Sequence, residues 1–454
     1  MTSLFISASA RLLRLSALSG SLLLLAFQAG HTPAFSLERK AARGALQECR
    51  SWRAAAAGSA DVDQEALEKA EAKGLEALRF SRQAHDPAGQ ATAHVHLGEI
   101  YGWRGEVPRA VAAFEEALNL ATAAGDRRGQ AAALKSWGVL RAGLKEWQSA
   151  LALLEEALPL WKELGDGPEQ GRTLYLIGVA LDRLGEKGRA VEHLQEALPF
   201  YRGDPGGEAD VRNALGGIEL VQGRNASALA HFQRALRLSL EEEDLPVEAA
   251  VRQGLGSLYQ RLGDLQSALD SYRRALSINE KVGEAVGQGR VLNSLGALYR
   301  DMGDPERALE SYWQALRVLP ADARADRAEV SFQMGRVHYL EGGDPEKARE
   351  QFEQALSLSS EGSNTRASAL FGMGLVRRSL ESPAAALPLL EEALALRRQR
   401  VNRLQEASVL LEIGRTYQAM GEMEKARSFM EQALEISRRV EGPLVEAAAL
   451  FRIA

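Results

Sequence analysis

The residue types that could act as acids, bases, nucleophiles or metal ligands are scattered along this sequence. Its histidines occupy unrelated places, and the two that lie closest, His94 and His96, would point to different faces of a helix. Cys49 is the only cysteine, so it cannot form an internal disulfide and has no second thiol with which to share a metal ion. We therefore predict no catalytic centre, no metal site and no bound cofactor.

Two other patterns look like functional motifs but have a structural explanation. Gly372 and Gly374 form a G-x-G sequence, yet both fall where helices are expected to pack, so no phosphate-binding loop is indicated. Pairs of glutamates, which could be mistaken for acid–base pairs, recur on the expected outer side of helices: Glu115–Glu116, Glu155–Glu156 and Glu391–Glu392. A solvated helix face explains them.

Composition narrows the class of protein further. Hydrophobic residues make up 46% of the 454 residues but aromatic residues only 6%, so apolar volume comes mostly from alanine and leucine, which favour helices. The 55 basic and 61 acidic residues give a net charge of −6. Such a balance provides no positive field for nucleic acid or for anionic lipid.

A unit of two helices recurs about every 40 residues, and residues 290–320 contain its most complete copy. In the first helix, Leu292, Leu295 and Leu298 are three residues apart and form an apolar stripe. Gly296 lies on the same stripe and has no side chain, which predicts that another group packs very closely there.

The turn and the second helix of this copy are equally clear. Gly303 can adopt the left-handed conformation that ends a helix, and Asp304 is placed to cap the next one. Ala308, Tyr312 and Ala315 then alternate small, large and small on one face of the second helix. Two antiparallel helices are therefore expected.

Small residues keep this register through the chain. The marker of the first helix is Gly98, Gly138, Gly178, Gly216, Gly256, Gly296, Gly335, Gly374 and Gly414. Alanines mark the second helix twice per unit, and a bulky apolar residue lies between them: Phe114, Leu154, Leu194, Phe232, Tyr272, Tyr312, Phe352, Leu390 and Met430. We predict that this bulky side chain fills the space that the small residues leave.

The order Leu-Gly-x-x-Tyr, alanine, aromatic, alanine and proline in residues 295–320 resembles the tetratricopeptide repeat. The resemblance covers residues 87–454 as nine units and the start of a truncated tenth. It implies an all-α fold, a right-handed α-solenoid of antiparallel helix pairs. The period is longer than the usual one of about 34 residues, as in similar bacterial arrays, and the extra residues in Leu118–Gly129 and Ile278–Gly289 predict longer second helices.

The two ends of the chain carry their own expectations. Arg11 and Arg14 precede the apolar run Leu15–Phe27, so residues 1–36 are predicted to be a secretory signal peptide, with an uncleaved membrane anchor as the alternative. Export from the cytoplasm follows in either case. Residues 37–86 read as a degenerate helical cap. Leu444–Ala454 starts another first helix, and we expect the natural protein to continue beyond it.

In the family that the sequence resembles, first helices line a concave groove that binds peptides. The matching positions in this chain are Asn213, Gln253, Gln260, Arg290, Asn293, Arg300, Arg336, Arg378 and Arg415. Three of the amides share one repeat position and could pair with a peptide backbone. The arginines suit carboxylates, so an acidic peptide or protein is the expected partner. Alternatively, they are surface residues paired with acids such as Asp301 and Glu329.

The function expected from the resemblance is that of a non-enzymatic, exported scaffold that binds a protein or peptide. The alternative is a sensor half of a longer enzyme, since the array is also similar to repeats that precede CHAT peptidase domains. The sequence printed here contains no histidine–cysteine pair of that type downstream of the repeats.

Overall fold

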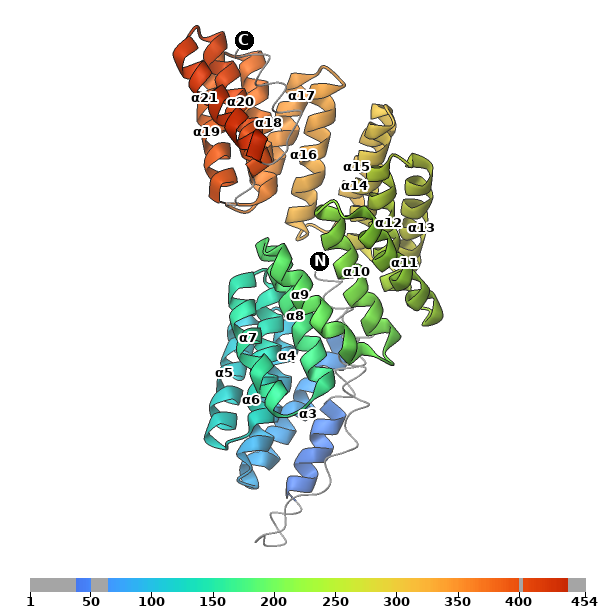
Figure 1. The fold of residues 1–454 in the computed structure, drawn as a ribbon. Coiled ribbons are helices and arrows are strands. Elements are labelled where there is room, and N and C mark those ends of the chain that lie inside the picture. The colour runs from blue at the N-terminus through green and yellow to red at the C-terminus, as the bar shows by residue number, and fades with distance from the viewer. Residues whose placement is uncertain (1–37, 50–63, 400–402, 440–454) are drawn as a thin grey trace. The chain divides into compact units, whose positions relative to one another are not determined.

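The computed structural model describes residues 38–49, 64–399 and 403–439 (Figure 1). The predicted signal segment and the start of a tenth unit lie outside these residues. The chain divides into two compact units, and each is described by itself. The N-terminal unit contains residues 1–258 and 281–284, and the C-terminal unit contains residues 259–280 and 285–454.

Helices account for the secondary structure of the described residues, as predicted, and no strand occurs among them. Residues 38–49 are helical, and α3 (Gln64–Gln83) precedes the repeats. The first helices of the repeats are α4 (Pro87–Trp103), α6 (Arg127–Gly143), α8 (Gly167–Leu184), α10 (Pro205–Val221), α12 (Leu245–Leu262), α14 (Ala285–Asp301), α16 (Arg324–Leu340), α18 (Asn364–Leu380) and α20 (Arg403–Ala419). The second helices are α5 (Val107–Ala123), α7 (Trp147–Glu163), α9 (Lys187–Ala197) with the 3-10 helix η2 (Leu198–Tyr201), α11 (Asn225–Glu241), α13 (Leu265–Lys281), α15 (Pro305–Val318), α17 (Pro345–Leu358), α19 (Pro383–Gln399) and α21 (Met423–Arg439).

The turns between paired helices follow the predicted chemistry. Gly303 has a φ of +78°, in the left-handed region that a residue with a side chain rarely adopts. The carboxylate of Asp304 accepts a hydrogen bond from the backbone N–H of Arg307 at 3.0 Å and so caps α15. In the turn between two repeats, from α5 to α6, Asp126 caps α6 in the same way, through the N–H of Gly129 at 3.0 Å. The predicted cap and turn are confirmed.

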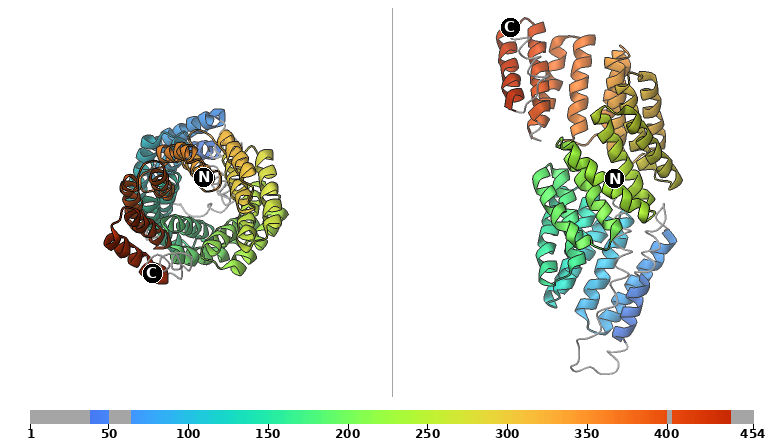
Figure 2. Two further views of the ribbon diagram at one scale, coloured as in Figure 1. Left: turned by 90° about the horizontal axis from the view of Figure 1, so that it is seen from above. Right: turned by 45° about the vertical axis from the view of Figure 1, so that its right-hand side comes forward.

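Within each unit, first helices pack most closely on their own second helices, as α4 does on α5 and α16 does on α17 (Figures 1 and 2). Second helices pack on the next first helix, as α5 does on α6 and α17 does on α18. Successive first helices also touch, as α4 touches α6 and α16 touches α18. Because first helices approach one another in this way, they form a shared wall in each unit. That wall is where a groove is expected.

The glycine markers give the bulky side chains their room, as predicted. A Cβ atom on Gly98 would lie 2.7 Å from Cε1 of Phe114, and one on Gly138 would lie 2.9 Å from Cγ of Leu154. Real Cβ atoms do not approach other carbons so closely. In these hairpins the bulky residue therefore packs directly against the backbone of its first helix.

The extra residues of the repeat lengthen several second helices, as expected. α5 and α13 each contain 17 residues and run well past the third small marker. α15 and α17 contain only 14 residues and end close to it. In the linker between the third and fourth repeats, Gly203 turns the chain with a φ of +87° after the short α9 and η2.

The single cysteine is not accessible to solvent. Cys49 is fully buried among Ala66, Leu67, Ala70 and Ile100.

Of the helices in the described ranges, none has the length and apolar character needed to cross a membrane.

Alanine substitutions at two adjacent glycines test the packing argument, because they should change the free energy of unfolding in opposite directions. A Cβ on Gly216 would meet the buried ring of Phe232 at 2.7 Å, so Gly216→Ala should lower the free energy of unfolding by about 1–3 kcal/mol. Gly217 has open space around it, so Gly217→Ala should raise that free energy by about 0.5–1 kcal/mol. Urea denaturation of the two variants measures both values, and equal effects would contradict the packing assignment.

Candidate functional site

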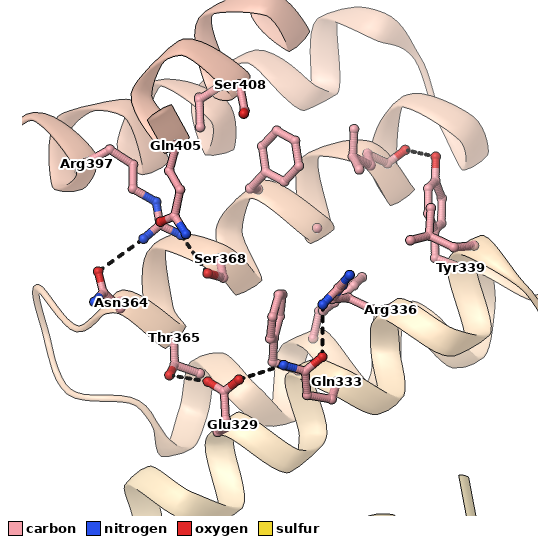
Figure 3. Close-up of a pocket in the computed structure, with 17 residues that line it drawn as sticks. Glu329, Gln333, Arg336, Tyr339, Asn364, Thr365, Ser368, Arg397, Gln405 and Ser408 are labelled. Carbon is pink, nitrogen blue, oxygen red and sulfur yellow. Dashed lines mark hydrogen bonds between the residues drawn. The ribbon is translucent and has the colours of Figure 1, made fainter. Parts of the chain in front are cut away.

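The described part of the C-terminal unit contains a pocket of about 490 Å³ on the wall formed by first helices (Figure 3). Three successive first helices, α16, α18 and α20, supply most of its lining, and the second helices α17 and α19 add one residue each. The lining residues are Glu329, Phe332, Gln333, Arg336, Tyr339, Leu340, Phe352, Asn364, Thr365, Ser368, Phe371, Gly372, Leu375, Arg397, Gln405, Ser408 and Val409. Its size falls within the range of small-ligand pockets.

One polar network runs along α16 and crosses to α18 (Figure 3). Glu329 accepts hydrogen bonds from Gln333 Nε2 and from Thr365 Oγ1, each at 2.8 Å. Gln333 Oε1 in turn accepts one from Arg336 Nη1 at 3.0 Å. The carboxylate therefore fixes the amide, and the amide fixes the guanidinium at the edge of the pocket.

A second network holds a buried arginine on the opposite side of the pocket (Figure 3). Arg397, near the end of α19, is only 4% exposed. It donates to Asn364 Oδ1 at 3.1 Å and to Ser368 Oγ at 2.6 Å, both on α18. Arg397 thus ties the end of α19 to the first turns of the preceding helix α18 and places a positive charge near Gln405.

The rest of the lining is apolar. Phe332 of α16 and Phe371 of α18 are half-buried, and Leu375 lies one turn after Phe371. Phe332 also packs on the buried ring of Phe352, with 6.0 Å between ring centroids and an interplanar angle of 39°. Aromatic surface therefore lies next to the two hydrogen-bonded networks.

Among the arginines predicted to line the groove, Arg336 is the one that lines this pocket. Its guanidinium lies 5.8 Å from the ring centroid of Phe332. Burial, and then the positive charge of Arg300, lower the pKa of Arg336. The site thus holds a cation at a cost that an incoming anion would reduce.

Two other predicted arginines are paired within the protein. Arg290 of α14 makes a two-pronged contact with Asp326 of α16, at 2.7 and 3.1 Å. Arg300 donates to Asp301 Oδ1 at 2.8 Å and to Gln333 Oε1 at 3.1 Å. Both arginines thus pair with a nearby acid, as the alternative interpretation of the sequence predicted. The contact of Arg290 also links neighbouring repeats.

Arg378 of α18 and Arg415 of α20 share one acid. Both donate to Glu412, a carboxylate whose side chain is only 6% exposed, and the Arg415 contact measures 3.1 Å. The shared carboxylate neutralises one of the two positive charges, and its burial makes a positively charged partner necessary. Neither arginine lines the pocket of the C-terminal unit.

The predicted amides are distributed over both units. Asn213 and Gln253 belong to the N-terminal unit, where both are half-buried. In the C-terminal unit, Gln260 donates to Asp301 Oδ2 at 2.6 Å, whereas the buried oxygen of Asn293 accepts no hydrogen bond from the described residues. Within the C-terminal unit, Arg336 lines the pocket, whereas the other predicted residues of that unit do not.

Tyr272 and Tyr312 fill the bulky position of two neighbouring repeats, but their hydroxyl groups differ in hydrogen bonding. Tyr272 donates its hydroxyl hydrogen to Gln260 Oε1 at 3.0 Å. The hydroxyl of Tyr312 is buried and has no hydrogen-bond partner among the described residues. Arg300 occupies the repeat position that Gln260 holds in the preceding unit. Burial raises the pKa of Tyr312 to about 12, so the phenol stays neutral.

Sequence reasoning missed most of the pocket lining. Phe332 and Phe371 occupy the same repeat position as Asn213, Gln253 and Asn293, so the register alone could have identified them. Arg397 carried no such signal, because it lies on a second helix and reaches the pocket only through the packing of α19 on α18.

The described residues contain no group of three or more His, Cys, Asp or Glu side chains that could hold a metal ion. Every glutamate pair named above is exposed on its second helix. The lining of the pocket thus offers hydrogen bonds, one partly buried and one buried guanidinium, and aromatic surface.

A family model of the tetratricopeptide repeat matches residues 129–203, 207–281, 255–321, 287–361, 326–399 and 365–439. The matches overlap and together cover well over half of the chain. The chain belongs to the tetratricopeptide repeat family. No curated protein sequence matches this tetratricopeptide repeat chain.

Solved structures resemble the tetratricopeptide repeat chain at low sequence identity. The apo form of the quorum sensor NprR from B. thuringiensis is 16% identical, with 64% of this chain and 97% of NprR covered and a TM-score of 0.45. The apo form of RapI is 13% identical, with 89% and 98% covered and a TM-score of 0.48. Aspartyl phosphate phosphatase F from Bacillus subtilis is 13% identical, with 77% and 94% covered and a TM-score of 0.49.

The two tyrosines give a stability test. Phenylalanine already fills this repeat position in Phe114, Phe232 and Phe352, so Tyr→Phe should be accepted at both sites. Tyr272→Phe should lower the free energy of unfolding by about 1 kcal/mol because it removes a hydrogen bond. Tyr312→Phe should leave it unchanged or raise it by up to about 1 kcal/mol. Chemical denaturation compares the two, and an equal loss would show that the Tyr312 hydroxyl is bonded.

Proposed function

We propose that this chain is a non-enzymatic scaffold that binds an extended peptide segment of a partner protein along the wall of α16, α18 and α20. One observation carries the proposal: a pocket of about 490 Å³ is lined by side chains from three successive repeats. An extended segment that crosses consecutive first helices can contact all three. A single repeat could not provide that surface.

The chemistry of the lining supports a peptide as the occupant. The amides of Asn364 and Gln405 border the pocket, and an amide group can donate to or accept from a peptide backbone. The amide of Gln333 also lines the pocket but is held by Glu329 and Arg336. Phe332 and Phe371 add apolar surface for a side chain. A mostly apolar concavity with a few placed polar groups is typical of binding pockets.

The test is to fill the pocket without disturbing the helices. Random dodecapeptides displayed on phage are selected on the immobilised wild-type chain, and enriched sequences are synthesised. Ser408→Trp should weaken their binding by about tenfold or more, roughly 1.4 kcal/mol, because the indole occupies the space of the peptide. Fluorescence polarisation gives the dissociation constants.

The matched control is Ser357→Trp, which adds the same side chain at an exposed site on the second helix α17. Ser357→Trp should bind the peptides as the wild type does. Failure to enrich any peptide, or equal binding to both tryptophan variants, would refute a binding role for this pocket.

We also propose that the scaffold works outside the cytoplasm, on the basis of the two arginines and the apolar run in residues 1–36. In a bacterial host that exports it, the mature chain should lack about 36 residues by intact mass spectrometry. Leu23→Arg with Leu24→Arg, which interrupts the apolar run, should keep the full mass. Full-length wild type in the membrane fraction would favour the anchor, and full-length wild type in the cytoplasm would refute export.

A further inference from the structure

The wall of first helices changes character along the chain at one repeat position. The residue three before the marker glycine is an amide in Asn213, Gln253 and Asn293 but a phenylalanine in Phe332 and Phe371. The structure places both phenylalanines, half-buried, at the pocket. The fold accepts an amide at this position in other repeats, so the two rings add apolar surface that those repeats lack.

The aromatic surface of the pocket continues onto the ring of Phe352. Gly372 of α18 lets this ring approach the helix backbone, because a Cβ atom there would meet the ring at 2.5 Å. The rings of Phe332 and Phe371 and the side chain of Leu375 line the pocket beside it. Apolar surface of this kind gains free energy when an apolar group covers it.

Two arginines at the edge of this pocket share one hydrogen-bond acceptor but differ in their ion pairs. Gln333 Oε1 accepts hydrogen bonds from both Arg336 and Arg300, at 3.0 and 3.1 Å. Arg300 also has the carboxylate of Asp301, whereas Arg336 forms no ion pair within the described residues.

Of the two glutamates near Arg336, one accepts hydrogen bonds from other side chains and the other is exposed to solvent. Glu329, on the same wall, already accepts from Gln333 and Thr365. Glu341, at the end of α16, is exposed, and its pKa is raised by partial burial of its carboxyl group. Arg290, Arg378 and Arg415, by contrast, each contact a carboxylate of the protein. Arg336 is thus the groove arginine whose carboxylate partner is not supplied by the described chain.

We propose that the pocket recognises an acidic residue next to a bulky apolar one in the bound peptide: the carboxylate binds Arg336, and the apolar side chain lies against Phe332 and Phe371. This inference rests on the proposed peptide-binding function and adds its specificity. A carboxylate can accept two parallel hydrogen bonds from a guanidinium, which a single amide oxygen cannot. Gln333 then remains as the acceptor for Arg300.

Two variants separate the acidic and apolar parts of the proposal, and both copy residues that other repeats carry at the same position. Arg336→Ala corresponds to Ala297, and Phe371→Asn corresponds to Asn293, so both should fold. Arg349→Gln, at a partly exposed arginine on α17 that pairs with Glu346, is the control for loss of a positive charge. Thermal unfolding by circular dichroism checks that all three keep the helical fold.

The experiment selects random dodecapeptides by phage display on the wild type and on each variant, and then compares the enriched sequences. Wild type and Arg349→Gln should enrich Asp or Glu beside Phe, Tyr, Trp or Leu. Arg336→Ala should lose the acidic preference and keep the apolar one. Phe371→Asn should do the reverse.

Synthetic peptides then quantify the contact. Replacing the selected Glu by Gln should weaken binding to wild type by about tenfold but change binding to Arg336→Ala by less than about twofold. Each peptide is made with a free and with an amidated carboxyl terminus. Loss of binding on amidation, with no effect of Glu→Gln, would assign the carboxylate to the chain end and refute the side-chain motif.

The failures of the two proposals are distinct. If no peptide is enriched on the wild type, the scaffold function itself fails. If peptides are enriched without an acidic and apolar pair, or with the same pair on Arg336→Ala, the specificity proposal is wrong and the scaffold function stands. Enrichment of basic peptides would indicate that Glu329, and not Arg336, binds the charged residue of the peptide, and would refute the specificity proposal.

Discussion

The fold depends on one contact, that of a bulky side chain from the second helix with the bare backbone of a glycine in the first. Each such contact closes one hairpin, as Phe114 does on Gly98 and Phe232 does on Gly216. The interior of a repeat is therefore built from its own two helices and from the next first helix. Stability of such an array is approximately a sum over neighbouring repeats.

This contact leaves other repeat positions free to vary. The position three before the glycine carries Asn213 or Asn293 in some repeats and Phe332 or Phe371 in others, while the glycine and its bulky partner keep their places. The glycines that admit the bulky side chains and the phenylalanines that line the pocket thus occupy different positions of the repeat. A site can change from amide to aromatic without altering the way in which the hairpins nest.

Charged residues on the shared wall mostly join one repeat to the next. Arg290 contacts Asp326 across α14 and α16, and Arg378 contacts Glu412 across α18 and α20. Arg290 and Asp326 are both partly buried and Glu412 is buried, so removing one member of either contact would leave a charge without its partner. Most arginines of the predicted row thus contact a carboxylate of the protein, and Arg336 differs from them in this respect.

The sequence alone determined the helix pairs, their turns and their register, because these depend on local chemistry. Gly303, Asp304 and Tyr312 have the roles that their types and spacing predict. Family membership follows from the same periodicity. The composition of the pocket was decided by tertiary structure, because it depends on which carboxylates reach which guanidiniums and on how α19 places Arg397 against α18. Residues more than 30 positions apart meet there, as Arg397 and Asn364 do, and spacing in the sequence holds no record of such pairings.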